Sequence, residues 1–199
     1  MDTTLVTHRL ALTPITSSDA AALHAVWTDP AVRRFLWDND VIPSAQTDEI
    51  IARNVRLFEK SGFGIWGVRE RGSRTLVGFA GFWHFRAPPA LELLFGVAST
   101  EWKRGIATES AARVMRYGFD VQGFESIDAS TDVANLASIR VLEKLGMTLR
   151  ERRTIDGLDT VFYRAQGSDW CPQPGAGIRD SQSLAAGPRL QRVVARLSC

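Results

Sequence analysis

Cysteine is scarce in this 199-residue chain, and both cysteines, Cys171 and Cys199, come after residue 170. Neither lies near a cluster of histidines, so the sequence gives no support for a disulfide framework or for a zinc site. We therefore expect no bound metal. This cysteine usage is typical of a reducing compartment, and a cytoplasmic protein is expected.

Long apolar runs are also missing. No segment reaches the roughly 18 consecutive apolar residues of a membrane-spanning helix. The N-terminal segment MDTTLVTHRLALTP contains Asp2 and has no apolar stretch of signal-peptide length. We expect a soluble protein that does not enter a membrane.

An excess of charge is absent from most of the chain. The net charge is +2, and residues 1–164 carry 20 positive and 20 negative side chains. A nucleic-acid partner would need a concentrated basic face, so the balance argues against one.

Hydrophobic periodicity places helices and strands along residues 1–164. Apolar residues recur at helical spacing in residues 19–27, 44–60, 105–121 and 135–146, and strand patterns occupy residues 8–13, 63–70, 75–85, 91–98, 126–130, 147–155 and 158–164. This order predicts a mixed α/β domain around one largely antiparallel sheet. Residues 165–199 are rich in Gly, Pro and Ser, which is typical of a disordered tail, and residues 189–197 could form a short basic helix.

The stretch EWKRGIATES, residues 101–110, joins the apolar run LELLFGVA to a predicted helix. A helix N-terminus offers unpaired N–H groups and a partial positive charge, and Gly105 lets an anion approach the main chain. With Lys103 and Arg104 beside it, a phosphate or pyrophosphate is the natural ligand. A plain helix start with a solvated cationic pair would have a similar sequence, so this alternative stays open.

A second motif, NLASIRVLEKLGM, begins a helix about thirty residues later. Asn135 is a good N-cap residue and Ser138 stands three positions after it, so capping alone explains both. Its pattern predicts that Leu136, Ile139, Leu142 and Leu145 face inward.

Three quoted segments, in this order, carry a resemblance to a known family. They are RLALTPITSSDAAAL with WTDPAVRRFL, LELLFGV followed by WKRGIATES, and NLASIRVLEKLGM. The chain resembles GNAT-superfamily N-acetyltransferases over residues 5–164, and in particular the branch of ribosomal-protein N-terminal acetyltransferases. The resemblance implies a single GNAT domain over residues 1–164, with helices on both faces of the sheet and a V-shaped divergence between two central strands.

The resemblance also implies that acetyl-CoA is bound and coenzyme A is released. Main-chain amides of the loop and helix start would bind the pyrophosphate, and Val97 would pair with the pantetheine arm as an added strand would. Asn135 and Ser138 would contact the pantetheine. The implied cofactor-binding residues are Val97, Trp102, Lys103, Arg104, Gly105, Ile106, Ala107, Thr108, Asn135 and Ser138.

Acetyl transfer to an amine needs a base, stabilisation of an oxyanion and a proton for the departing thiolate. Glu92 is the ionisable residue inside the run ALELLFGVA and matches the strand glutamate of the branch, although it could instead face outward on an amphipathic strand. A main-chain N–H near Val97 would serve the oxyanion. Much of the superfamily has a tyrosine where this chain has Leu142, so Ser138, or a water that it positions, would supply the proton.

Aromatic residues and His84 are candidates for the acceptor site. Trp37, Trp83 and His84 would contact the acceptor, although packing or surface exposure also accounts for them. The acceptor would be a small-molecule amine or a protein N-terminus, and the protein would be a monomer or a homodimer. No cysteine lies in residues 1–164, which favours direct transfer in a ternary complex without a covalent enzyme intermediate. The alternative is a non-catalytic acyl-CoA-binding module on the same fold, which Leu142 favours.

Overall fold

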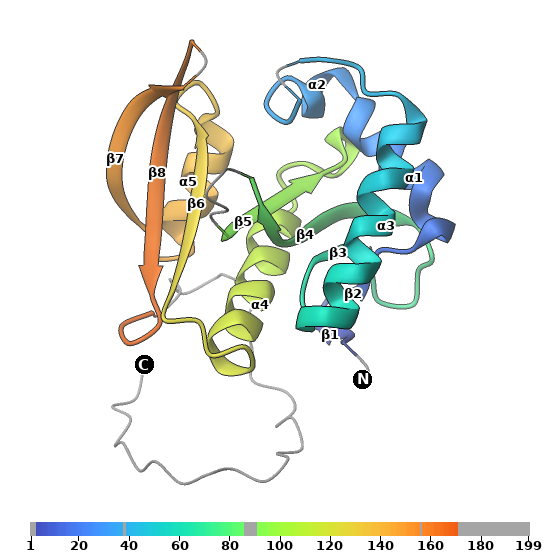
Figure 1. The fold of residues 1–199 in the computed structure, drawn as a ribbon, viewed down its shortest axis with the longest axis horizontal. Coiled ribbons are helices and arrows are strands. Elements are labelled where there is room, and N and C mark those ends of the chain that lie inside the picture. Colours follow the sequence, from blue (N-terminus) through green and yellow to red (C-terminus); the bar gives the residue numbers. More distant parts are fainter. Residues whose placement is uncertain (1–2, 38, 86–90, 156, 171–199) are drawn as a thin grey trace, which may run out of the picture.

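One mixed sheet runs through the computed structural model, which describes residues 3–37, 39–85, 91–155 and 157–170 (Figure 1). Within these residues the strands are β1 (Leu5–Val6), β2 (Leu10–Pro14), β3 (Ile65–Glu70), β4 (Leu76–His84), β5 (Leu91–Val97), β6 (Ser126–Asp132), β7 (Thr148–Ile155) and β8 (Leu158–Gln166). The helices are α1 (Ala20–Thr28), α2 (Pro30–Arg33), α3 (Ser44–Ser61), α4 (Ile106–Asp120) and α5 (Leu136–Lys144), with 3-10 turns η1 (Ser17–Asp19) and η2 (Ser99–Glu101). The predicted α/β class is confirmed.

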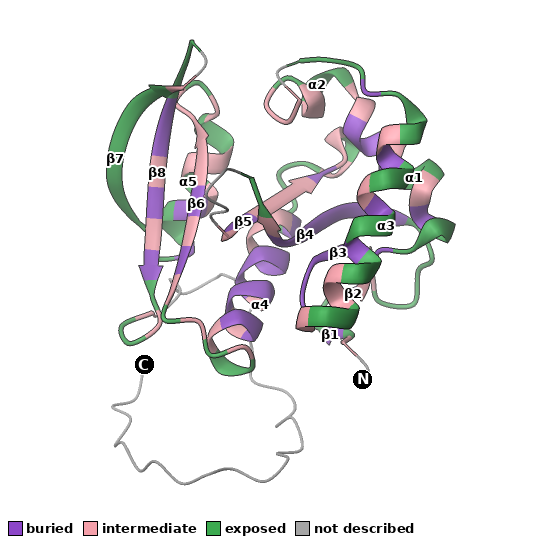
Figure 2. Cartoon of the chain, in the orientation of Figure 1, coloured by how far each residue is buried: buried purple, intermediate pink, exposed green. Residues whose placement is uncertain are grey.

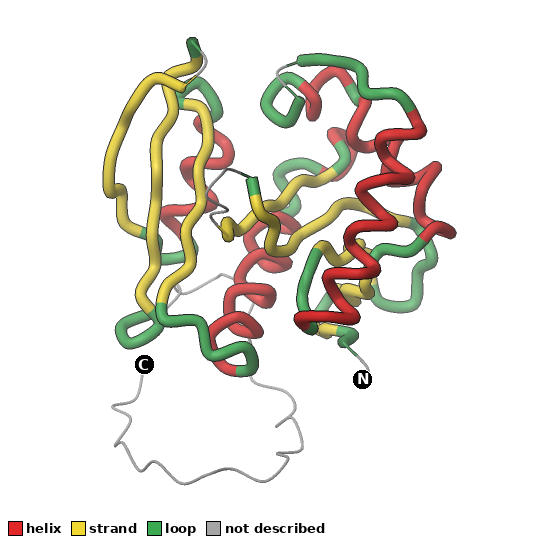
Figure 3. The backbone as a smooth tube through the Cα atoms, viewed as in Figure 1, coloured by secondary structure: helices red, strands yellow, loops and turns green. Residues whose placement is uncertain are grey.

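The strand order is β1-β2-β3-β4-β5-β6-β8-β7, and every neighbouring pair is antiparallel except β5 and β6. Strands β4 and β5 stay in register from Gly78↔Val97 to His84↔Leu91. In the described residues β5 and β6 pair only at Glu92↔Asp128 and then diverge. Figure 3 shows β6, β8 and β7 running together beside the other strands. The expected V-shaped divergence is therefore present, and it opens between β5 and β6.

Two hydrophobic clusters cover the two faces of the sheet, one built with α4 and α5 and the other with α1 and α3 (Figure 1). On β5, Leu91, Leu93 and Val97 pack in the first cluster and Leu94 packs in the second. Because successive strand residues point to opposite faces, Glu92 shares the face of Leu94. The carboxylate therefore lies on the side covered by α1 and α3.

Burial differs strongly between elements (Figure 2). Helix α4 is buried along one side, including Ala111, Val114 and Met115, which are fully covered. Strand β7, at the sheet edge, is exposed along most of its length. The chain thus holds α4 tightly against the sheet, which fixes the start of this helix relative to β5.

Helix α3 is attached to the sheet by a buried asparagine. The Asn54 side chain accepts the N–H of Ile65 at 2.7 Å and donates to the carbonyl of the same residue at 3.0 Å. A side chain that bonds both the N–H and the C=O of a strand residue replaces the hydrogen bonds that a neighbouring strand would make. This attachment fixes which side of α3 faces the sheet.

The last strand continues past residue 164, where the sequence pattern places the end of the domain. Ala165 is buried and pairs with Ile127 of β6. Trp170 donates its indole N–H to the Leu145 carbonyl at 2.7 Å and stacks near Phe119 with ring centroids 5.2 Å apart. Ordered packing therefore reaches residue 170, because the indole ring buries apolar surface that composition alone does not reveal. Both cysteines and the basic segment 189–197 lie outside the described residues.

None of the helices in the described ranges combines the length and the apolar character that a bilayer-spanning segment requires.

Candidate active site

The loop after β5 enters α4 through two left-handed residues. Lys103 has φ of 64° and Gly105, the N-cap of α4, has φ of 76°. Left-handed backbone is readily adopted by glycine but costs an ordinary residue about 1–2 kcal/mol. Strain of this kind is concentrated at functional sites, and here it aims the loop amides ahead of the helix.

Six successive backbone N–H groups, from residue 103 to residue 108, are left unpaired at this entry. Within the described ranges none of them donates to a protein acceptor, and the first α4 amide that does so belongs to Glu109, which donates to the Gly105 carbonyl at 3.0 Å. Unpaired amides together with the helix dipole create a site for an anion. Ile106 is buried, so only its main chain faces this site, whereas Ala107 and Thr108 are partly exposed.

The two cations of the loop are used differently. Arg104 forms ion pairs with Glu101 and Glu70, and its hydrogen bond to Glu101, followed by that to Glu70, raises the pKa of the guanidinium. Lys103 is exposed and has no ion-pair partner among the residues that the structure describes. Arg104 therefore holds the loop against its neighbours, while the Lys103 charge is not paired with any described residue.

A buried glutamate anchors the first turn of α4 to the N-terminal strands. Glu109 is 2% exposed; it accepts the Thr7 hydroxyl at 2.6 Å and the Arg9 Nε at 2.7 Å. Arg9 also donates to the Arg104 carbonyl at 3.0 Å. The sequence provides no signal for this pair, because the partners are about a hundred residues apart and Glu109 has the pattern of an ordinary first-turn acid.

Val97 presents its backbone to the divergence between β5 and β6. Ala98 donates to the Val77 carbonyl at 2.9 Å, and residues of an antiparallel ladder alternate between facing their partner and facing away. The N–H and C=O of Val97 therefore point away from β4. The carbonyl accepts the Trp102 indole N–H at 2.9 Å, which leaves the N–H directed toward the gap.

The start of α5 keeps its predicted cap. Asn135 accepts the Ser138 N–H at 3.2 Å with its side chain, and the Ser138 hydroxyl is partly exposed with no protein partner in the described ranges. Leu142 and Leu145 are buried, as expected, but Leu136 is 57% exposed, so its predicted inward orientation is wrong. In the first turn, next to the cap, Leu136 lies beyond the reach of the core.

Glu92 lies where β5 and β6 meet. Glu92 is buried, with only 4% of the residue exposed. The Ser130 hydroxyl of β6 donates a hydrogen bond to one of its carboxylate oxygens at 2.6 Å. In the same place Asp128 forms a two-bond ion pair with Arg164 of β8, which raises the pKa of that arginine. The outward orientation considered for Glu92 is thus not observed. The sequence analysis did not identify Ser130 as a partner of Glu92. Its position two residues after Asp128 places both side chains on one face of the same strand, and that spacing could have indicated it.

The acceptor candidates separate into two groups. Trp37 packs edge-on against Trp27, with ring centroids 5.5 Å apart, in the cluster under α1 and α3. Trp83 is the register partner of Glu92 on β4, and it lines a pocket together with exposed His84. The structure places Trp83 opposite Glu92, brings Trp83 and His84 together at one pocket, and gives Trp37 a packing role.

The α2 segment, which precedes Trp37, is nevertheless linked to the turn before the α4 loop by a hydrogen bond. The Ser99 hydroxyl of η2 donates to Asp29, the N-cap of α2, and this hydrogen bond lowers the pKa of the Asp29 carboxyl. The contact joins the α2 segment to the turn that precedes the six free amides.

Comparisons with known proteins agree with this geometry. The profile of the acetyltransferase (GNAT) domain family matches residues 9–148. An uncharacterized N-acetyltransferase of Bacillus subtilis, YoaA, is 31% identical over 147 residues, covering 71% of this chain and 81% of its own. A GNAT-family acetyltransferase from Bacillus anthracis has a similar fold, with a TM-score of 0.72 at 22% identity over 83% of this chain and 99% of that one. RimL, a ribosomal L7/L12 alpha-N-protein acetyltransferase in complex with coenzyme A, has a TM-score of 0.68 at 19% identity, over 82% of this chain and 97% of that one.

Proposed function

Because the chain belongs to the GNAT acetyltransferase family, we propose that it moves the acetyl group of acetyl-CoA to a primary amine by direct transfer in a ternary complex. The acceptor is a small-molecule amine or a protein N-terminus, and the likeness to RimL supports the second class. One observation carries the proposal: six free amides at the entry of α4 lie beside the divergence of β5 and β6.

The residues at this entry fit coenzyme A. Amides of residues 103–108 and the Lys103 charge would hold the pyrophosphate, and the Val97 N–H would pair with the pantetheine arm. Ser138 would contact the same arm through its free hydroxyl, while Asn135 keeps the α5 start in place. When bound, acetyl-CoA supplies an acetyl group activated as a thioester.

Glu92 is the proposed base. It is buried, held by Ser130, and situated at the apex of the divergence, on the face that also carries Trp83. A carboxylate in such a position can take a proton from an amine, directly or through one water. The Val97 N–H, which points into the gap, would stabilise the developing oxyanion.

Ser138 is the proposed source of the proton for the departing thiolate, directly or through a water that it positions. Leu142, at the position where many relatives have a tyrosine, is 1% exposed within the core, so it has neither a proton nor access. This leucine is the feature that favours the second candidate function, a non-catalytic acyl-CoA-binding module. Glu92 and Ser138 are the features that count against it.

We expect acetyl-CoA turnover in a panel of primary amines and N-terminal peptides, measured as release of the coenzyme A thiol. At least one acceptor class should give release well above the rate without acceptor, because Glu92 would accept the proton of the amine while the loop amides would hold acetyl-CoA. If coenzyme A binds but no acceptor in the panel accelerates release, the binding-module alternative is correct.

Replacing Gly105 with tryptophan should weaken coenzyme A binding by about a hundredfold, because two or more charge-assisted hydrogen bonds to the loop amides are lost. A Cβ at this position has only an Arg9 nitrogen within 4 Å, at 3.5 Å, so the indole would extend over the amides without disturbing the core. Calorimetric titration with coenzyme A measures the change.

Gly105→Ala is the matched control, since it carries the same left-handed strain without the bulk. It should bind coenzyme A much more tightly than the tryptophan variant. Equal binding by the native protein and Gly105→Trp would show that the anion lies elsewhere.

A further inference from the structure

One side of α3 carries three cations at helical spacing. Arg53, Arg56, Leu57 and Lys60 lie at positions i, i+3, i+4 and i+7, which share one side of a helix. Together with Trp83 and His84 of β4 they line a pocket of about 230 Å³. We refer to it as the α3–β4 pocket.

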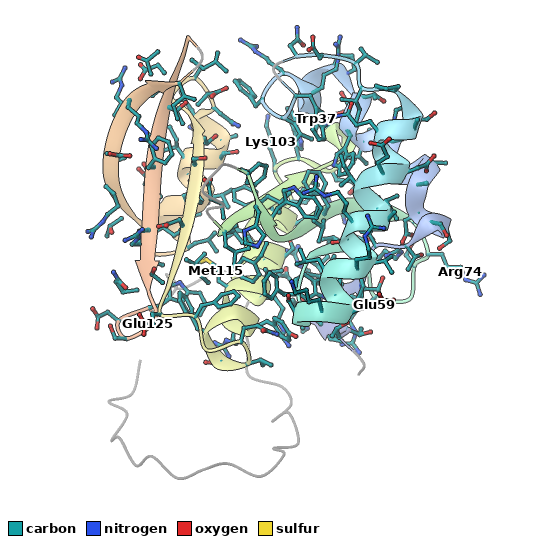
Figure 4. All side chains as sticks on the ribbon, viewed as in Figure 1. Trp37, Glu59, Arg74, Lys103, Met115 and Glu125 are labelled. Atoms are coloured by element: carbon teal, nitrogen blue, oxygen red, sulfur yellow. The ribbon has the colours of Figure 1, made fainter. Side chains whose placement is uncertain are left out.

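The positive charge of this pocket is not paired with any carboxylate that the structure describes. In the described ranges Arg53, Arg56 and Lys60 form no ion pair, and no carboxylate lines the pocket. Glu59, labelled in Figure 4, belongs to the same helix but is not among the lining residues. Unpaired cations that converge on a concavity attract an anionic group.

The pocket has a fixed geometry as well as a charge. The Arg53 guanidinium lies over the Trp83 ring, 5.0 Å from its centroid, and such a cation–π contact holds the planar group in place. Asn54 attaches the neighbouring side of α3 to β3, so the cations keep their position relative to the sheet. A guanidinium held in this way can offer paired N–H donors to a carboxylate.

Trp83 connects the pocket to the proposed base. It is the register partner of Glu92 in the antiparallel β4–β5 pair, and directly opposed residues project on the same face. Glu92 and the Trp83 wall of the α3–β4 pocket therefore lie on one face of the sheet. A molecule whose amine approaches Glu92 can place its other end among the three cations.

We propose that the α3–β4 pocket binds a carboxylate of the acetyl acceptor, so that the preferred substrates are amines that carry a carboxylate near the amino group. This inference rests on the proposed transferase function and narrows its substrate class. Amino acids and protein N-termini with an acidic residue beside the first position both have this chemistry. The volume of about 230 Å³ accommodates a carboxylate with a few carbons.

Matched acceptor pairs test the preference. In each pair one member carries an anionic group that the other lacks: phenylalanine against phenylalanine amide, and C-terminally amidated peptides with Asp against Asn at the second position. We expect kcat/KM for thiol release to be about tenfold or more higher for the carboxylate of at least one pair, as for a hydrogen bond to a charged group. The pair that shows the higher kcat/KM for its carboxylate member tells whether the acceptor is a small amino acid or a protein N-terminus with an acidic second residue.

Charge reversal tests the residues. In Arg56→Glu and Lys60→Glu the ratio of kcat/KM for carboxylate over amide should fall to one or below. Arg74→Glu is the control, because Arg74 is exposed on the β3–β4 turn and is drawn at the edge of the molecule in Figure 4; it should keep the native ratio. Thermal unfolding of each variant confirms that it is folded.

The two proposals fail in different ways. Thiol release that is equal for both members of every pair overturns the anionic acceptor and leaves the transferase standing. If both α3 variants keep the native ratio of kcat/KM for carboxylate over amide, the carboxylate binds elsewhere. That result overturns the assignment of the α3–β4 pocket. Absence of release with every acceptor overturns the transferase and, with it, the substrate class.

Discussion

Glu92→Gln should lower kcat/KM for acetyl transfer by about a hundred- to ten-thousandfold, the range typical of removing a general base. Glutamine has nearly the same shape and its amide oxygen can still accept the Ser130 hydroxyl, so the junction of β5 and β6 should keep its structure. The amide has no basic site at neutral pH. Steady-state thiol release with the best acceptor of the panel measures the loss.

Coenzyme A affinity provides the control for this variant, since the six amides at α4 are independent of the Glu92 side chain. Calorimetry should give the native dissociation constant. If instead Glu92→Gln leaves both the rate and its pH dependence unchanged, Glu92 is a structural bridge to Ser130 and the base assignment is wrong.

Arg9→Met should lower the free energy of unfolding by about 2–3 kcal/mol. The substitution removes the cation from Glu109, which is 2% exposed, and a buried charge that loses its partner is strongly destabilising. We place the effect at the low end of the usual range because the Arg9 side chain is itself 48% exposed and partly screened by solvent. Denaturant unfolding measures the change.

The Arg9 variant should also weaken coenzyme A binding, because Arg9 holds the Arg104 carbonyl next to the free amides. Arg9→Met combined with Glu109→Gln should recover part of the stability, since the second substitution removes the buried charge. Arg71→Met, at an exposed arginine near the end of β3, is the matched control and should change stability by less than about 0.5 kcal/mol. A loss for Arg9→Met no larger than this control would contradict the anchoring role.

Local features of the site were predictable from the sequence. The pattern of an apolar strand, a glycine and an apolar helical stripe correctly located the entry of α4, and Asn135 has the capping position expected of it. These features depend on residues within a few positions of one another. Backbone preferences and hydrophobic periodicity act at that range, so they are legible in a single sequence.

Other features required long-range pairing and could not be predicted. Arg104 pairs with Glu70, which is 34 residues away, and the Val97 carbonyl is already bonded to the Trp102 indole. The cations of α3 have visible helical spacing, but nothing in the sequence says that this side of the helix faces Trp83. Partners of this kind are selected by strand register and by the orientation of a helix on the sheet.

The sequence by itself therefore determined the order of elements, the α/β class and the position of the α4 entry, because each follows from short-range geometry. Only the tertiary structure decided that β5 and β6 meet at Glu92 and then diverge, that Arg104 forms ion pairs with Glu70 and Glu101, and that three cations of α3 line a pocket with Trp83. Those outcomes depend on which distant segments pack together. The free energy of that packing comes from contacts throughout the core, so no single motif in the sequence reveals it.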